Sequence, residues 1–111
     1  MTPYVIDKRS GGRIKREMAV QVKTRSDIKH VYTIDLSHGG VKIGGALLKL
    51  PLGEPVELLV EKGSEHILFA GRVEREDGLF HISRIGRDAN TFFIHIADSR
   101  FPEFVRSNYH I

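Results

Sequence analysis

The chain of 111 residues contains no cysteine and no tryptophan. The absence of cysteine excludes disulfide bonds and any zinc or redox site built on thiolates. No apolar run approaches the length needed to span a membrane, and the N-terminal residues lack the apolar core of a secretory signal. We therefore expect a cytoplasmic protein that does not insert into a membrane.

The sequence also lacks the usual signatures of catalysis. It contains no nucleophile elbow, no phosphate-binding loop and no evident pair of catalytic carboxylates. Asp35, Ser37 and His38 include the residue types of a hydrolytic triad, but neighbours on one turn point in different directions. His81 and His95, on predicted strands, are candidates for a metal site, but no helical spacing or thiolate supports one. We expect no catalytic residue, no metal and no cofactor.

Short apolar runs with strand-like alternation fill most of the chain. Turns rich in Gly, Pro and Asp separate them, and the length fits one domain. The predicted strands cover residues 18–23, 30–34, 41–43, 56–61, 66–74, 79–83 and 91–96. Residues 76–78 and 87–90 are interpreted as turns between the last three of these strands. The pattern predicts an all-β fold, either an antiparallel barrel or a sandwich.

The C-terminal segment has a different pattern. Asp98 or Ser99 can cap a short helix. Phe101, Phe104 and Val105 would then share one apolar face of that helix. We predict a short C-terminal α-helix that packs against the strands.

Basic side chains gather near the N-terminus. Residues 8–29 contain eight Lys or Arg residues and two acidic ones, a net charge of +6 against +3 for the whole chain. This asymmetry favours a local anionic partner. The Ser10–Gly12 segment restrains the backbone little, so we expect residues 1–13 to form a flexible, ligand-binding arm. Residues 14–111 are expected to form the single domain.

Two short motifs carry the chemistry. Arg9 and Arg13 bracket a Ser-Gly-Gly segment, and each guanidinium offers parallel N–H groups to guanine O6 and N7 or to phosphate oxygens. The segment 35–40, Asp-Leu-Ser-His-Gly-Gly, combines a carboxylate acceptor, a hydroxyl and two glycines. A carboxylate can accept from the N–H groups of guanine. Taken alone, the motifs can be solvated charges and a tight turn; together they predict a site for a guanine nucleotide.

The pattern Arg9-x-x-x-Arg13 followed by Asp35-x-Ser37-x-x-Gly40 resembles that of a PilZ domain, and the resemblance covers nearly the whole chain. PilZ domains are bacterial receptors for cyclic di-GMP and fold as a six-stranded antiparallel β-barrel with a helix near the C-terminus. The resemblance implies a PilZ-like barrel here. It also implies a receptor that changes conformation on binding cyclic di-GMP and relays the signal to a partner protein that controls motility, adhesion or polysaccharide export.

The resemblance implies roles for the residues of both motifs. Arg9 and Arg13 would fold over the ligand and bind guanine edges and phosphates. Asp35 and Ser37, at the lip of the barrel, would hydrogen-bond a guanine.

Other ligand-binding positions follow from the same resemblance. Gly39 and Gly40 would let the backbone approach the base. Lys8 precedes the first arginine, where a basic residue favours an intercalated pair of ligand molecules. Many PilZ domains carry an aromatic residue at the position of Arg75; here the Arg75 guanidinium can stack on a guanine in its place.

Two other binding functions stay open at this point. A small basic β-barrel can bind single-stranded nucleic acid, although most aromatic residues here fall at inward strand positions rather than beside the basic arm. A ligand-free PilZ-like barrel can act as a protein adaptor, but such adaptors typically lack the arginines and the carboxylate found here. We therefore predict cyclic di-GMP, and no nucleic acid, as the ligand, with a downstream protein of unknown identity as the partner.

Overall fold

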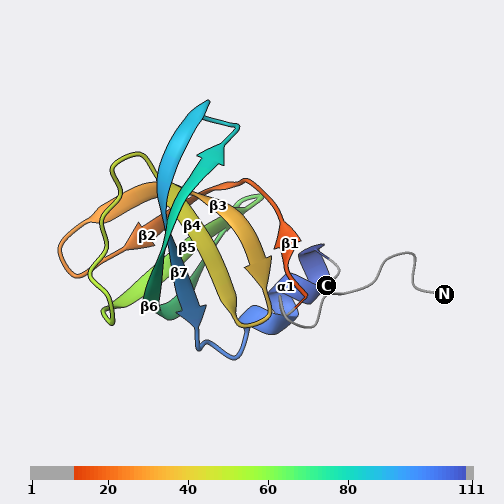
Figure 1. Cartoon of the computed structure of the whole chain (residues 1–111). Helices are drawn as coiled ribbons and strands as arrows, with labels where there is room; N and C mark the ends of the chain where they lie inside the picture. The colour runs from red at the N-terminus through yellow and green to blue at the C-terminus, as the bar shows by residue number, and fades with distance from the viewer. Residues whose placement is uncertain (1–11, 110–111) are drawn as a thin grey trace.

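The structure is a computed structural model that describes residues 12–109 as seven strands and a C-terminal helix (Figure 1). The strands are β1 (Ile14–Lys15), β2 (Ala19–Lys23), β3 (Ile28–Ser37), β4 (Gly40–Gly45), β5 (Pro55–Lys62), β6 (Glu65–Ile82) and β7 (Arg87–Ile96). The helix is α1 (Phe101–Tyr109).

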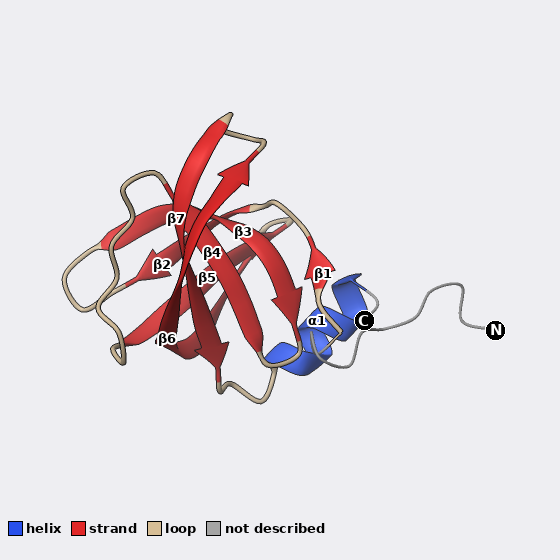
Figure 2. Ribbon diagram, viewed as in Figure 1, coloured by secondary structure: helices blue, strands red, loops and turns tan. Residues whose placement is uncertain are grey.

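Six of the strands close into a ring. The hydrogen-bonded order runs β3, β2, β5, β6, β7 and β4, and β4 pairs with β3 to complete the circle. All of these pairings are antiparallel. Figure 2 shows the strands wrapped around a common interior, with α1 outside one end. The predicted six-stranded antiparallel barrel with a short C-terminal helix is confirmed, and the two-residue β1, paired with the end of β3, is an additional strand.

The barrel interior is filled by alternate, mostly aliphatic side chains of the ring strands. Fully buried examples from five strands are Val22, Val41, Ile43, Leu58, Val73 and Ile94. Phe69 connects this core to α1, because its ring centroid lies 5.0 Å from the ring centroid of Phe101 and 5.1 Å from that of Phe104. Val105 is also fully buried, so the predicted apolar face of the helix closes one end of the barrel. Within the described part of the chain, no helix is long and apolar enough to cross a membrane.

The β6–β7 hairpin corrects part of the sequence interpretation. Residues 76–78 and 87–90, predicted as turns, lie inside β6 and β7. β6 continues through the predicted turn, and its register with β7 shifts twice, once just before Arg75 and once just before Gly78. Gly78 has a φ of +79°, which suits a bulge as well as a turn, so composition alone does not separate the two. The chain reverses at residues 83–86, at the tip of a hairpin that projects beyond the barrel (Figure 1).

The second sequence motif lies mostly in strands. Asp35 and Ser37 belong to β3 rather than to a turn, and the reversal into β4 uses only His38 and Gly39. Ser37 is paired with Gly40 across this tight hairpin. The motif residues are therefore held by the backbone hydrogen bonds of the sheet, which fixes their positions more firmly than a loop would.

We predict that Gly40→Ala destabilises the barrel by about 1–3 kcal/mol, the usual cost of overpacking. A Cβ at position 40 would lie 2.3 Å from the backbone oxygen of Ile94 and 2.6 Å from the Phe93 ring. Gly39→Ala is the matched control, because a Cβ there meets nothing within 4 Å. Urea denaturation of both variants measures the difference, and equal stabilities would contradict this account of Gly40.

Candidate functional site

Four side chains from four adjacent strands form a row across the sheet. Asp35 of β3 lies opposite Lys42 of β4, Lys42 lies opposite Phe93 of β7, and Phe93 lies opposite Arg75 of β6. Residues directly opposite one another in antiparallel strands project from the same face. The row is therefore a continuous patch that combines a carboxylate, an ammonium group, an aromatic ring and a guanidinium.

A β-bulge puts this row on the outer face of the barrel. Thr33 is fully buried and Leu36 belongs to the core, although the two are an odd number of residues apart. Regular alternation from Thr33 would send Asp35 into the interior. The register of β3 shifts between Thr33 and Asp35, which reverses the alternation and turns Asp35 outward. The irregularity just before Arg75 occurs at the other end of the row.

Phe93 forms a platform at the centre of the patch. Its side chain is outside the core cluster, yet the residue is only 7% exposed. Two guanidinium groups cover it, with Cζ of Arg75 4.5 Å and Cζ of Arg13 5.1 Å from the ring centroid. Each contact has the geometry of a cation–π interaction. The ring thus holds the arm residue Arg13 and the strand residue Arg75 at one place.

Arg13 also binds the carboxylate of the row. β1 sets its position, because Lys15 lies opposite Asp35 and Arg13 directly precedes β1. Nη1 of Arg13 donates to Oδ1 of Asp35 at 3.5 Å. The Asp35 side chain is 15% exposed. Burial raises the pKa of Asp35 above its ordinary value and Asp77 adds to the rise, although Arg13, Lys42 and Lys15 act in the opposite direction. The nearby cations therefore offset the burial of this carboxylate only in part.

Ser37 and the two glycines lie at the hairpin end beside Asp35. The Ser37 hydroxyl is buried and donates to the backbone oxygen of Gly40 at 3.4 Å. Packing against β7 already requires glycine at position 40, whatever binds outside. Gly39 has open space around its Cα, so it is the position where another molecule can approach the backbone.

Three of the predicted site residues meet here, because Arg13 contacts both the Asp35 carboxylate and the Phe93 ring, and Arg75 lies on the same ring. Lys8 and Arg9 lie outside the described residues, so their roles stay predictions. Sequence reasoning missed Lys42, Phe93 and Asp77. One signal for Phe93 was available, because two adjacent phenylalanines in an alternating strand cannot both face the interior.

A hollow of about 350 Å³ adjoins the platform on β6 and β7. Arg72 and His95 lie opposite each other at its wall, and His95 lies two residues beyond Phe93 on the same face of β7. Small residues line much of the remainder, namely Ala70, Gly71 and Ala97. The surface available to a ligand therefore extends beyond the row itself.

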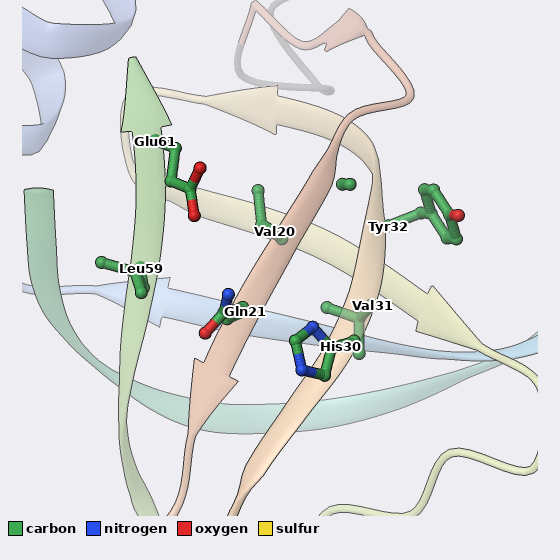
Figure 3. A pocket seen from close by; sticks show the side chains of 8 residues that line it. Val20, Gln21, His30, Val31, Tyr32, Leu59 and Glu61 are labelled. Atoms are coloured by element: carbon green, nitrogen blue, oxygen red, sulfur yellow. The ribbon is translucent and has the colours of Figure 1, made fainter. Parts of the chain in front are cut away.

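Another hollow, of about 290 Å³, lies over β2 between β3 and β5 (Figure 3). Gln21 of β2 lies between His30 of β3 and Leu59 of β5, and Tyr32 and Glu61 line the same hollow (Figure 3). None of its eight lining residues is Lys or Arg. It lacks the positive charge that a nucleic-acid backbone requires.

The two histidines considered for a metal site are separated along the β6–β7 hairpin. His81 lies 3.3 Å from Asp88 through its Nδ1, whereas His95 lies opposite Arg72. Over residues 12–109, no group of three or more His, Cys, Asp or Glu side chains has the arrangement of a metal site.

Several solved structures share this fold. The PilZ domain of CeSA from a cellulose-synthesizing bacterium is 27% identical with a TM-score of 0.58, and the match covers 86% of this chain and 92% of that one. The Bacillus subtilis inhibitor of motility MotI/DgrA is 18% identical with a TM-score of 0.56; the match covers 78% of this chain and only 41% of MotI/DgrA. An uncharacterized Legionella protein is 11% identical with a TM-score of 0.51, over 84% of each chain.

A search of curated proteins finds no significant match. The family model described as the PilZ domain matches residues 7–86, a span that includes both motifs and Arg75. This match covers well over half of the chain, and the closed antiparallel barrel agrees with the PilZ domain structure of CeSA. The chain belongs to the PilZ domain family.

Proposed function

We propose that this protein is a non-enzymatic receptor for cyclic di-GMP in the bacterial cytoplasm. PilZ domains are binding and regulatory domains, and the family includes receptors for this nucleotide. The observation that carries the proposal is that Arg13 contacts both the Asp35 carboxylate and the Phe93 ring, on which Arg75 also lies. Cyclic di-GMP presents two guanine bases and two phosphates, whose acceptors, donors and flat faces match these groups.

Each group has a definite part in the proposed complex. Asp35 accepts hydrogen bonds from guanine N–H groups, which offset the cost of burying its carboxylate. Arg13 binds a phosphate or the acceptor edge of a base. Ser37 lies on the same face of β3 as Asp35, and Gly39 leaves room for the ligand beside it. Arg75 contributes a guanidinium already stacked on an aromatic ring.

The arm preceding Arg13 completes the proposed site. Arg9 is four residues from Arg13, so the intervening chain spans at most about 14 Å and Arg9 is within reach of the same ligand. Lys8 precedes it and adds a further positive charge, which suits a second ligand molecule stacked on the first. Arm residues that close over a nucleotide lose conformational entropy only on binding, so the bound state presents a new surface.

The segment between β1 and β2 offers a route from the arm to the rest of the molecule. Arg16 places its Cζ 5.3 Å from the ring centroid of Tyr109, at the end of α1. The Glu17 carboxylate accepts from the backbone N–H groups of Ser83 and Arg84, at 3.3 and 3.2 Å, at the tip of the β6–β7 hairpin. We propose that ordering of the arm is transmitted to these two elements and read by a downstream protein.

Replacing Arg9, Arg13 or Asp35 by Ala should weaken cyclic di-GMP binding about 10- to 150-fold. This corresponds to about 1.5–3 kcal/mol, the range for hydrogen bonds to charged groups. Calorimetric titration measures the dissociation constants, with GTP and cyclic di-AMP as comparison ligands.

Arg25→Ala is the matched control for the arginine variants. Arg25 lies in the β2–β3 turn, where its side chain is 81% exposed and pairs with Glu54, so the variant removes the same charge away from the site. Binding by Arg25→Ala should equal that of the unaltered protein. If the Arg13 and Asp35 variants also bind normally, the site is wrongly placed. If binding instead weakened with added salt as steeply as protein binding to nucleic acid does, the nucleic-acid alternative would be favoured.

The raised pKa of Asp35 predicts opposite pH effects on folding and binding. The pKa of Asp35 is higher in the folded chain than in the unfolded chain. As the pH rises from the unfolded-state pKa through the folded-state pKa, ionisation of Asp35 lowers the free energy of unfolding. Asp35→Asn should therefore raise the thermal unfolding midpoint at pH 7, and the gain should disappear in acid. Ligand affinity should fall as the pH falls through the raised pKa. Melting and titration curves from pH 4 to 8 measure both; an Asn variant less stable than wild type at pH 7 would refute the account.

Glu17→Gln should uncouple the hairpin tip from the arm. We expect amide hydrogens of Ser83 and Arg84 to exchange faster in this variant, because a neutral amide accepts more weakly than a carboxylate. Cyclic di-GMP should slow exchange at these amides in the wild type and change it less in the variant. Hydrogen-exchange mass spectrometry measures both effects, with Glu61→Gln on β5 as the control. Unchanged exchange at the tip in Glu17→Gln would argue against this route.

A further inference from the structure

Two cations of the candidate site are already engaged by a carboxylate that neither motif contains. Oδ1 of Asp77 accepts from Nε of Arg75 at 2.9 Å, and Oδ2 of Asp77 lies 4.0 Å from Nζ of Lys42. Asp77 lies in the second register irregularity of β6, between Glu76 and Gly78. Its side chain is 18% exposed and that of Lys42 is 19% exposed. The extra residue in the strand thus inserts a negative charge between two positive ones.

This carboxylate has the same recognition chemistry as a ligand phosphate. Both are anionic, accept hydrogen bonds only and can bind a guanidinium and an ammonium group at once. Asp77 also acts on the other acid of the site, because its charge contributes to the raised pKa of Asp35. Asp77 therefore lowers the positive potential of the patch and occupies its cations while no external anion is bound.

We propose that Asp77 is an internal counter-ion that competes with the phosphate of the ligand, and that Lys42 is a further cation of the binding site. The proposal rests on the proposed function, since the competitor it names is cyclic di-GMP. On binding, a phosphate oxygen takes the place of the Asp77 carboxylate beside Lys42 and Arg75. The affinity for the ligand then depends on how much more strongly Lys42 and Arg75 interact with the phosphate than with Asp77.

Arg75 keeps its position when Asp77 is neutralised. Its Nη1 donates to Glu74 at 2.9 Å, and its guanidinium lies on the Phe93 ring. Lys42 stays in the row opposite Asp35 and Phe93, with its ammonium 5.6 Å from the ring centroid of Phe80. Removal of the Asp77 charge therefore takes one counter-charge away from Arg75 and Lys42, while Glu74 and the Phe93 ring still orient Arg75.

The test compares the affinities of variants for cyclic di-GMP by calorimetry at fixed ionic strength. Asp77→Asn should bind about three- to tenfold more tightly than the wild type, and the gain should shrink with added salt. Lys42→Met should bind more weakly, and in the double variant most of the gain from Asp77→Asn should be lost. Circular dichroism and thermal melting check that each variant is folded, and Asp77→Ser replaces Asp77→Asn if the latter does not fold.

Asp88→Asn is the matched control, because it makes the same change of charge at an exposed acid that pairs with His81 near the hairpin tip. If it tightens binding as much as Asp77→Asn does, the effect is one of net charge and the proposal fails. The proposal also fails if Asp77→Asn does not bind cyclic di-GMP more tightly than the wild type. Weaker binding would make Asp77 a positioning residue for Arg75, and equal binding would mean that Asp77 does not affect the ligand. Failure of the wild type to bind overturns the proposed function as well, whereas a binding wild type with an unaffected Asp77 variant overturns only this inference.

Discussion

The candidate site depends on the register of the antiparallel ladder, and above all on the bulge in β3. A strand alternates strictly between its two faces, so one extra residue decides whether Asp35 points into the core or toward solvent. With the bulge, Asp35 joins Lys42, Phe93 and Arg75 in a row that crosses four strands. None of these residues is held by a flexible loop. The barrel therefore presents the chemistry in place before any ligand arrives.

Local alternation predicted an all-β fold, either a barrel or a sandwich, and the apolar spacing after Asp98 predicted the C-terminal helix. The resemblance to PilZ domains then selected the barrel and related Arg13, Asp35 and Ser37 to one predicted site. The adjacent phenylalanines indicate that either Phe92 or Phe93 faces outward, but the meeting of Phe93 and Lys42 with Asp35 and Arg75 depends on pairings between strands far apart in sequence. Asp77 was missed for another reason. Glu-Asp-Gly is typical of turns, but here the same residues form an irregularity within a long strand.

The charges of the patch are balanced against one another. Arg13 pairs with Asp35, whereas Lys42 and Arg75 share Asp77. The Asp35, Lys42 and Asp77 side chains are each less than a fifth exposed, so salt screens their interactions less than those of fully exposed pairs. An incoming anion must replace internal partners rather than meet bare cations. Such a surface discriminates by geometry as well as by charge, because only a ligand that satisfies both the cations and the released carboxylates gains from the exchange.

Gly40 separates folding from binding within a single motif. The backbone of β7 leaves no room for a side chain at this position, so the glycine is needed to assemble the barrel whether or not a nucleotide is ever bound. Asp35 stands in the opposite relation to the fold, because its burial opposes its charge. In related sequences under selection for folding alone, the glycine would be preserved and the acid would drift. An intact glycine in a distant homologue is thus evidence of a shared fold, and the acid is the better marker that the candidate site is retained.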